Sequence, residues 1–317
     1  MVAPLDFEKN ITELESKLDG LRNFSGGEGV DIAKEVGRLE KKLDRLMHSK
    51  YENLSPWEKV QVARHPERPH YLDFLKGLFD DFEELAGDRA FGEDKALVGG
   101  LARFDGQPVM VLGLEKGHDT ESRIKHNFGM PKPEGYRKAK RLMAMADHFG
   151  LPLITFVDTS GAHPGLEAEE RGQAEAIARS IEAMMNLTVP VVVVVTGEGG
   201  SGGAIAVAVG NQILMLEHGI YSVVSPEGCA SILWRTADKK QEAAVAQKFT
   251  AQDLKALKVI DTIIPEPLGG AHRNPNQVFA SVKMAIKEAL KKMSSKSGAD
   301  LQSERREKFL AMGKIGL

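Results

Sequence analysis

The sequence contains very little cysteine, few aromatic residues and almost no net charge. One cysteine, Cys229, stands among 317 residues, which rules out a disulfide within the chain and a cysteine-based zinc site. Aromatic residues make up 6%, few for a surface that stacks nucleic-acid bases. The net charge is −3, from 42 Lys and Arg against 45 Asp and Glu. We therefore expect neither a nucleic acid nor a membrane surface as a partner.

Long apolar runs are also missing. The longest β-branched run, Val191 to Val195, is far too short to cross a bilayer. The first residues have no basic stretch followed by an apolar one, so we expect no signal peptide and a cytoplasmic protein. The nine histidines are scattered without metal-ligand spacing, so we expect no metal on this chain.

The composition that remains is that of an ordinary globular protein with a helical extension. Hydrophobic residues make up 42% and charged residues 27%, enough for a sizeable core. Two runs of apolar residues step by three and four, which predicts two helices joined by a turn at Gly26-Gly-Glu-Gly29: Phe7, Ile11, Leu14, Leu18 and Leu21, then Ile32, Val36, Leu39, Leu43 and Leu46. We expect a helical hairpin over 1–50, a main domain over 51–292, and a polar tail over 293–317 with room for a short last helix.

The main domain is predicted to be α/β. Ser55 to Glu58 has capping-box spacing, and Leu72, Leu75, Phe79 and Phe82 predict a further amphipathic helix. Asp105-Gly106 between two apolar segments indicates a tight β-hairpin. Buried strands are expected at 151–157 and 189–196, with a long helix over 167–185 between them, and shorter strands at 213–216, 221–224 and 259–264.

A loop with five glycines, residues 197–203 (the glycine loop), follows the second buried strand. Gly197, Gly199 and Gly202 fit a dinucleotide-binding fingerprint, with Glu217 about twenty residues on. Ser201 also stands at the centre of G-x-S-x-G, the spacing of a hydrolase nucleophile, with Asp253 or Asp261 and then His272 following in order.

A third interpretation of the glycine loop needs no side chain. Glycines allow a ligand close to the backbone, and the first amides of a helix are unpaired donors. Gly202 and Gly203 would then offer N–H groups to an oxyanion, each worth about 3–4 kcal/mol. A plain strand-to-helix turn is the structural alternative, but it does not need so many glycines.

Several segments resemble the family of acetyl-CoA carboxylase carboxyltransferase α subunits. The resemblance runs in uninterrupted order from about Leu5 to about Asn276 and is carried by Gly197-Glu-Gly-Gly-Ser-Gly-Gly-Ala204, Ser225-Pro-Glu-Gly-Cys-Ala-Ser-Ile-Leu-Trp234, Asp261-Thr-Ile-Ile-Pro-Glu-Pro-Leu-Gly-Gly-Ala-His272, Asn127-Phe-Gly-Met-Pro131 and Glu169-Glu-Arg-Gly-Gln-Ala-Glu-Ala-Ile-Ala178. In this context Cys229 is interpreted as a small buried residue rather than a nucleophile.

The resemblance implies a crotonase-like fold, a spiral of β-β-α units whose loops build oxyanion holes. It implies a separate β subunit in an α2β2 assembly, with a zinc ribbon on that subunit and not here. The substrates would be carboxybiotin, arriving on the biotin carboxyl carrier protein, and acetyl-CoA. No cofactor would be bound covalently, and ATP would be used only by the biotin carboxylase component.

The resemblance also assigns site residues. Gly202 and Gly203 would supply the oxyanion hole on the biotin side, and the adjoining substrate-binding loops would be Gly199, Gly200 and Ser201 with Thr159, Ser160, Gly161 and Ala162. Lys116 and Arg123 are candidates for contacts with CoA phosphates or an acidic carrier protein. The sequence departs from the family pattern at Leu114, Ser160 and His163.

Two further alternatives stay open beside the Ser201 hydrolase. One is a stand-alone crotonase-like acyl-CoA hydratase or hydrolase, which would be active without a second chain. The other is a scaffold whose apolar helical stripes hold partners together, in which case the glycine loop would tolerate substitution.

Overall fold

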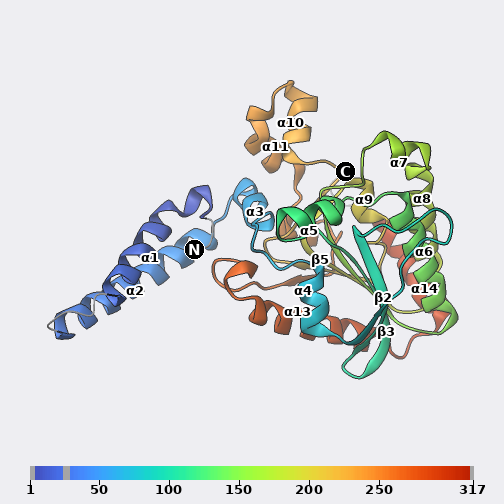
Figure 1. Ribbon diagram of the computed structural model, residues 1–317, viewed down its shortest axis with the longest axis horizontal. Coiled ribbons are helices and arrows are strands. Elements are labelled where there is room, and N and C mark those ends of the chain that lie inside the picture. The colour runs from blue at the N-terminus through green and yellow to red at the C-terminus, as the bar shows by residue number, and fades with distance from the viewer. Residues whose placement is uncertain (1–3, 24–28, 315–317) are drawn as a thin grey trace.

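The computed structural model describes residues 4–23 and 29–314, and a mixed β-sheet lies at its centre (Figure 1). Hydrogen-bonded neighbours follow the order β1 (Asp80–Glu84), β2 (Leu97–Phe104), β3 (Gln107–Leu114), β4 (Leu153–Thr159), β5 (Val191–Gly200), β6 (Gln212–Leu216) and β8 (Thr262–Ile264), while β7 (Ile220–Ser222) pairs with the end of β5. Strands β1 to β3 are antiparallel, and β3 to β8 run parallel. The carboxyl ends of β3, β4 and β5 therefore meet at one edge.

The hairpin predicted at Asp105-Gly106 is confirmed. Phe104 pairs with Gln107, so the turn has two residues, with φ values of 49° at Asp105 and 78° at Gly106. Positive φ at both positions matches the twist of the adjoining strands.

Helices cover both faces of the sheet and enclose two hydrophobic cores (Figure 1). One core lies against α6 (Pro133–His148), α8 (Gln173–Asn186), α9 (Ser201–Ile205) and α12 (Ala251–Ala256). The other lies against α4 (Tyr71–Leu78) and α13 (Pro275–Met293). Every residue of β4 and β5 is buried, as expected for continuous apolar strands between two helical layers.

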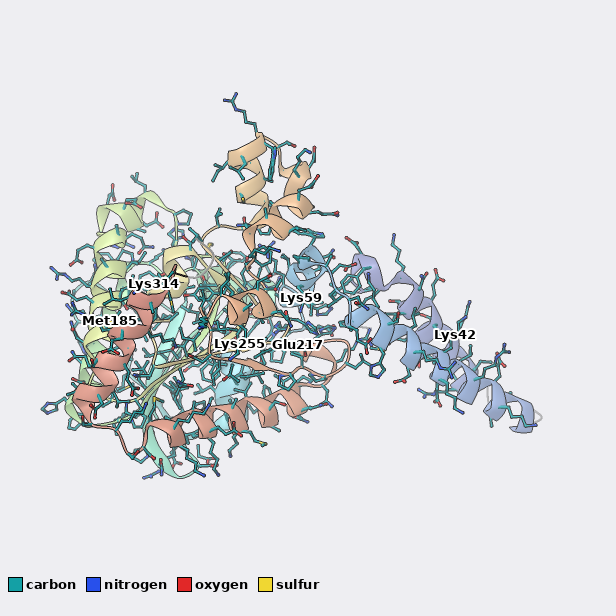
Figure 2. The ribbon with its side chains drawn as sticks, turned by 180° about the vertical axis from the view of Figure 1, so that it is seen from behind. Lys42, Lys59, Met185, Glu217, Lys255 and Lys314 are labelled. Carbon is teal, nitrogen blue, oxygen red and sulfur yellow. The ribbon has the colours of Figure 1, made fainter. Side chains whose placement is uncertain are left out.

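Two pairs of helices project from this body (Figure 1). Helices α1 (Lys9–Arg22) and α2 (Gly29–Tyr51) run side by side away from it; the expected turn residues 26–28 lie outside the described part. Arg273 holds the base of this hairpin through ion pairs to Glu8 at 3.0 Å and Glu15 at 2.6 Å. Figure 2 shows Lys42 well out along the hairpin. Helices α10 (Pro226–Trp234) and α11 (Lys240–Gln247) form the second projection.

The remaining helices are short connectors. They are α3 (Pro56–Ala63), α5 (Thr120–Lys125), α7 (Leu166–Glu170) and the single turns η1 (Asp6–Glu8), η2 (Asn127–Gly129), η3 (Ala237–Lys239) and η4 (Ala271–Arg273). Helix α3 begins with the predicted capping box, in which the Ser55 side chain accepts a hydrogen bond from the Glu58 amide.

Two helix predictions were wrong in extent. The helix expected to include Phe79 and Phe82 ends at Leu78, and an unpredicted strand, β1, follows. The single helix expected over 167–185 is divided into α7 and α8, because Gly172 adopts a left-handed conformation with φ 79° at the start of α8. The expectation for the last segment allowed a short helix, and the structure has the longer α14 (Gly298–Ala311). Figure 2 shows α14 running along α8 near Met185.

Candidate functional site

Two loops that the sequence singled out lie in direct backbone contact at the carboxyl ends of β4 and β5. A Cβ on residue 200 would lie 2.3 Å from the Ser160 carbonyl oxygen, and a Cβ on residue 203 would lie 2.4 Å from the Ala162 nitrogen. Only glycine fits at these two positions without moving the opposite backbone. The structure thus brings the glycine loop and residues 159–162 together.

The glycine loop ends in a sharp turn into α9. Ser201, the first residue of this helix, has φ 56°, a value rare for a residue with a side chain. Because Ser201, Gly202 and Gly203 open the helix, their amides have no carbonyl partner within it. Gly203 is buried against the opposite loop, whereas the nearest neighbours of a Cβ on Gly202 would be 3.7 Å away.

Gly202 lines a pocket of about 600 Å3. Apolar side chains form most of its wall, including Ile205, Tyr221, Val223, Leu254, Leu257, Val259, Phe309 and Met312; the polar lining residues are Ser201, Ser222, Gln247 and Lys248. A mostly apolar pocket with a few polar groups is the usual form of a small-molecule site.

Thr159 fixes the opposite loop. Its hydroxyl accepts a hydrogen bond from the Gly161 amide at 3.0 Å and donates to the Gly161 carbonyl at 2.8 Å. Gly161 has φ 148°, which a larger residue rarely adopts. This side chain therefore shapes the loop that faces the glycine loop, rather than the pocket itself.

Lys116 belongs to a charged cluster with Asp158, Glu198 and Arg64, three residues that the sequence did not identify as site candidates. Lys116 Nζ is 2.6 Å from Asp158 Oδ1, and the same oxygen accepts the Glu198 amide at 2.9 Å. Arg64 binds the Glu198 carboxylate through Nη2 at 2.6 Å and Nε at 3.2 Å. Burial raises the pKa of Asp158, but Lys116 and His70 lower it by a larger amount. The net pKa lies below the usual value for an aspartate, so the carboxylate stays charged. In the sequence, Asp158 could have been identified only from its position directly after the apolar run 151–157, which predicts a buried strand.

Lys116 and Arg123 line a smaller pocket of about 200 Å3, together with Arg64, His70 and Asp158. Three basic residues further along the chain have structural partners: Arg137 pairs with Asp88 at 3.0 Å, Lys138 with Glu93, and Arg141 donates to the carbonyls of Leu85 and Gly87. They fasten the segment between β1 and β2 to α6.

The Ser201 hydrolase interpretation fails on geometry. Both ring nitrogens of His272 are buried without a hydrogen-bond partner, and the ring stacks on His65 with centroids 3.7 Å apart. Asp261 accepts from the Ile213 amide and pairs with Lys308, and the Asp253 carboxylate accepts the hydroxyl of Thr250, the N-cap residue of α12. None of these three residues contacts Ser201, so no nucleophile–base pair is formed.

Leu114 and His163, two of the positions at which the sequence departs from the family pattern, lie in a buried strand and in a half-buried loop. Leu114 is fully buried in the sheet, and His163 Nε2 lies 2.8 Å from Glu167 Oε1 in a half-buried loop. Within residues 4–23 and 29–314, no group of three or more acidic, His or Cys side chains is arranged to hold a metal ion. No helix in the described ranges is both long and apolar enough to span a bilayer.

Comparison with known proteins places nearly the whole chain in one family. Residues 4–313 match the family model described as acetyl co-enzyme A carboxylase carboxyltransferase-like. The acetyl-coenzyme A carboxylase carboxyl transferase subunit alpha of Paramagnetospirillum magneticum is 61% identical over 313 residues, 99% of each chain. Its namesakes from Rhodospirillum centenum and Sinorhizobium medicae are 58% and 60% identical over similar lengths.

Solved structures share the fold at low identity. A transcarboxylase 12S chain matches with a TM-score of 0.60 and 22% identity, covering 72% of this chain and 42% of that one. A chain of a Pseudomonas malonate decarboxylase hetero-tetramer with coenzyme A matches with a TM-score of 0.59 and 17% identity, covering 75% and 97%. The fold is crotonase-like, as expected. With a full-length family match and relatives near 60% identity, this chain belongs to the family of acetyl-coenzyme A carboxylase carboxyl transferase α subunits.

Proposed function

We propose that the chain transfers the carboxyl group of carboxybiotin to acetyl-CoA, giving malonyl-CoA for fatty acid biosynthesis, together with a separate β subunit. The family match and the near-60% identity over 99% of the chain support the activity. The observation on the molecule itself that carries the proposal is the contact of the glycine loop with residues 159–162, which leaves the first amides of α9 beside an apolar pocket.

The chemistry calls for fixed amide donors. Loss of CO2 from carboxybiotin leaves negative charge on the ureido oxygen, and loss of a methyl proton from acetyl-CoA leaves charge on the thioester oxygen. Donors held in place before the reaction stabilise such charges without reorganisation. We assign Gly202 and Gly203 to the biotin side and expect the β subunit to supply the donors for the thioester. The biotin nitrogen can take the methyl proton, so no side-chain base is required.

The wider assembly is part of the same proposal. The chain would pair with the β subunit as α2β2, receive carboxybiotin on the biotin carboxyl carrier protein, and depend on biotin carboxylase for the step that uses ATP. Zinc would be bound by the β subunit. The assembly would work in the cytoplasm.

The small pocket at Lys116 and Arg123 is proposed to receive an anionic group of CoA or of the carrier. Lys116 already bonds Asp158, and Arg123 Nε donates to the Gly117 carbonyl at 3.3 Å. The guanidinium fork of Arg123 is therefore the better candidate for a phosphate.

Carboxyl transfer from malonyl-CoA to free biotin tests the activity. We expect no turnover from this chain alone and clear turnover when the β subunit from the same source is co-expressed with it. Turnover by the chain alone would instead favour a stand-alone acyl-CoA enzyme, and none in a verified α–β complex would refute the proposed transfer.

The amide assignment has its own test. Gly202→Pro deletes one N–H where the structure leaves room for a side chain, and it is expected to lower kcat about 100-fold. Gly202→Ala keeps the amide and is the matched control, expected to lose much less. Equal turnover in the two variants would show that the Gly202 amide is not an oxyanion donor.

A further inference from the structure

The carboxylate of Asp158 occupies a space that the glycine loop leaves open for it. Asp158 is buried at the carboxyl end of β4. A Cβ on Gly197 would lie 2.5 Å from Asp158 Oδ1, so the side chain lies directly against the backbone of β5. Glycine at position 197 therefore leaves space for the Asp158 carboxylate rather than for a ligand.

The carboxylate is bonded to the loop itself. Oδ1 accepts the amide of Glu198, the residue that follows Gly197 and precedes Gly199. The register between β4 and β5 shifts around this bond, since Val157 pairs with Val195 but Thr159 pairs with Gly199. The Asp158 bond spans this irregularity, where the regular ladder no longer fixes the backbone.

Two basic side chains from other parts of the chain, Lys116 and Arg64, hold this contact in place. Lys116, after β3, bonds Asp158 Oδ1 at 2.6 Å and lies 3.8 Å from Glu198 Oε2. Arg64, after α3, binds the Glu198 carboxylate on both oxygens and also Glu227 of α10 at 2.8 Å. Hydrogen bonds between charged groups are short and directional, so the cluster restricts how the loop can shift.

We propose that Asp158, held by Lys116, is a positioning residue whose carboxylate fixes the start of the glycine loop and thereby places the amides of Gly202 and Gly203. The inference rests on the proposed function, in which these amides stabilise an oxyanion. It assigns Asp158 no contact with substrate. Because such donors act only when they lie within hydrogen-bond reach of the charged oxygen, a shift of the loop by about 1 Å lowers turnover by about 100-fold.

The test compares variants of Asp158 in the α–β complex. Asp158→Ala removes both the acceptor and the charge, and it is expected to lower kcat for malonyl-CoA-dependent biotin carboxylation about 100-fold, with KM changed less than about threefold. Asp158→Asn keeps an acceptor oxygen for the Glu198 amide and is expected to recover most of this loss. Hydrogen exchange of the peptide that contains residues 197–203 is measured in parallel and is expected to rise in the Ala variant.

Asp261 offers a matched control. Its carboxylate also accepts a strand amide, that of Ile213 at 2.7 Å, and also pairs with a lysine, Lys308. It lies before β8, at the amino ends of the strands rather than beside the glycine loop. Asp261→Ala is therefore expected to affect exchange near Ile213 and to leave exchange over residues 197–203 as in the wild type.

The outcomes separate the inference from the proposed function. Unchanged exchange over residues 197–203 in Asp158→Ala overturns the inference, whatever the turnover, as does a loss that appears only in KM. If the Ala variant does not fold, Lys116→Met, which frees the carboxylate from its lysine, is expected to raise exchange over the same peptide by a smaller amount, because the carboxylate still accepts the Glu198 amide; the absence of any rise overturns the inference equally. If exchange rises as expected but Gly202→Pro turns over normally, the loop is positioned by Asp158 and the oxyanion assignment fails.

Discussion

Gly202 and Gly203 are adjacent in sequence but have different surroundings, which predicts different costs for the same substitution. In Gly203→Ala the new Cβ would lie 2.4 Å from the Ala162 nitrogen and 2.5 Å from the Gly161 carbonyl carbon, so the two loops must separate. In Gly202→Ala the nearest atoms are 3.7 Å away. We expect Gly203→Ala to lower turnover about 100-fold and Gly202→Ala to lower it only a few-fold. Steady-state kinetics of the α–β complex measure both; equal losses would contradict the geometry.

A second prediction at the residue scale concerns Glu266, which is buried against Arg68. Arg68 Nη1 and Nη2 donate to its two oxygens at 2.9 and 2.6 Å. Burial raises the pKa of Glu266, but the facing guanidinium lowers it by a larger amount, and the net pKa is about 2. A folded-state pKa below the unfolded value adds stability that is complete above about pH 4.3 and is lost as the pH falls towards 2.

Glu266→Gln removes the titrating carboxyl group and with it the pH dependence that Glu266 gives to the stability of the fold. The difference in unfolding free energy between the wild type and the variant is expected to shrink by about 3 kcal/mol between pH 5 and pH 2. Urea unfolding at a series of pH values measures it, because other carboxylates titrate alike in both proteins. A pH-independent difference would mean that the ion pair does not control the titration of Glu266.

Among the elements, α14 is fastened to the body in part through one fully buried side chain, Arg305. Arg305 Nη1 donates to the carbonyls of Met184 at 2.9 Å and Leu187 at 2.8 Å, and Nη2 donates to Asn211 Oδ1 at 2.7 Å. No carboxylate is among these partners, and burial lowers the pKa of Arg305 to about 10. The guanidinium thus caps the last carbonyls of α8, where a cation is favourable.

Arg305→Met should therefore destabilise the chain by about 3 kcal/mol, because it leaves several buried acceptors unpaired. Arg306→Met, at the next and exposed position, is the matched control and should change stability by less than about 0.5 kcal/mol. Thermal unfolding with a probe on α14 measures both. Similar melting temperatures for the two variants would show that the Arg305 hydrogen bonds do not hold the helix.

The same elements show what sequence patterns can predict here. Apolar runs and the Asp-Gly turn predicted β2 to β5, because β4 and β5 are buried along their whole length and β2 and β3 along most of theirs. Strand β1 was missed since its Asp80 to Glu84 sequence is acidic and mostly exposed, so only pairing with β2 makes it a strand. The glycine density identified the loop at the site, but Lys116 and Asp158 meet only because β3 and β4 are neighbours in the sheet, which no local pattern contains.

On the scale of the whole molecule, the sheet separates two cores, and β5 contributes to both. Val193 and Val195 belong to the core against α6 and α8, while Val192 and Val194 belong to the core against α4 and α13. This alternation is the period-two geometry of a strand whose two faces are both covered. The strand that carries the glycine loop is therefore held from both sides, which gives the site a rigid support.

This arrangement predicts that the two faces of β5 contribute separately to stability. Val193→Ala and Val194→Ala each remove two buried methyl groups from a different core, and each should cost about 2 kcal/mol. Since the two side chains share no apolar neighbours across the sheet, the double variant should cost the sum to within about 0.5 kcal/mol. Equilibrium urea unfolding measures all three variants. A coupling above about 1 kcal/mol would mean that strain passes through the sheet from one core to the other, so that β5 and the glycine loop would move as either core relaxes.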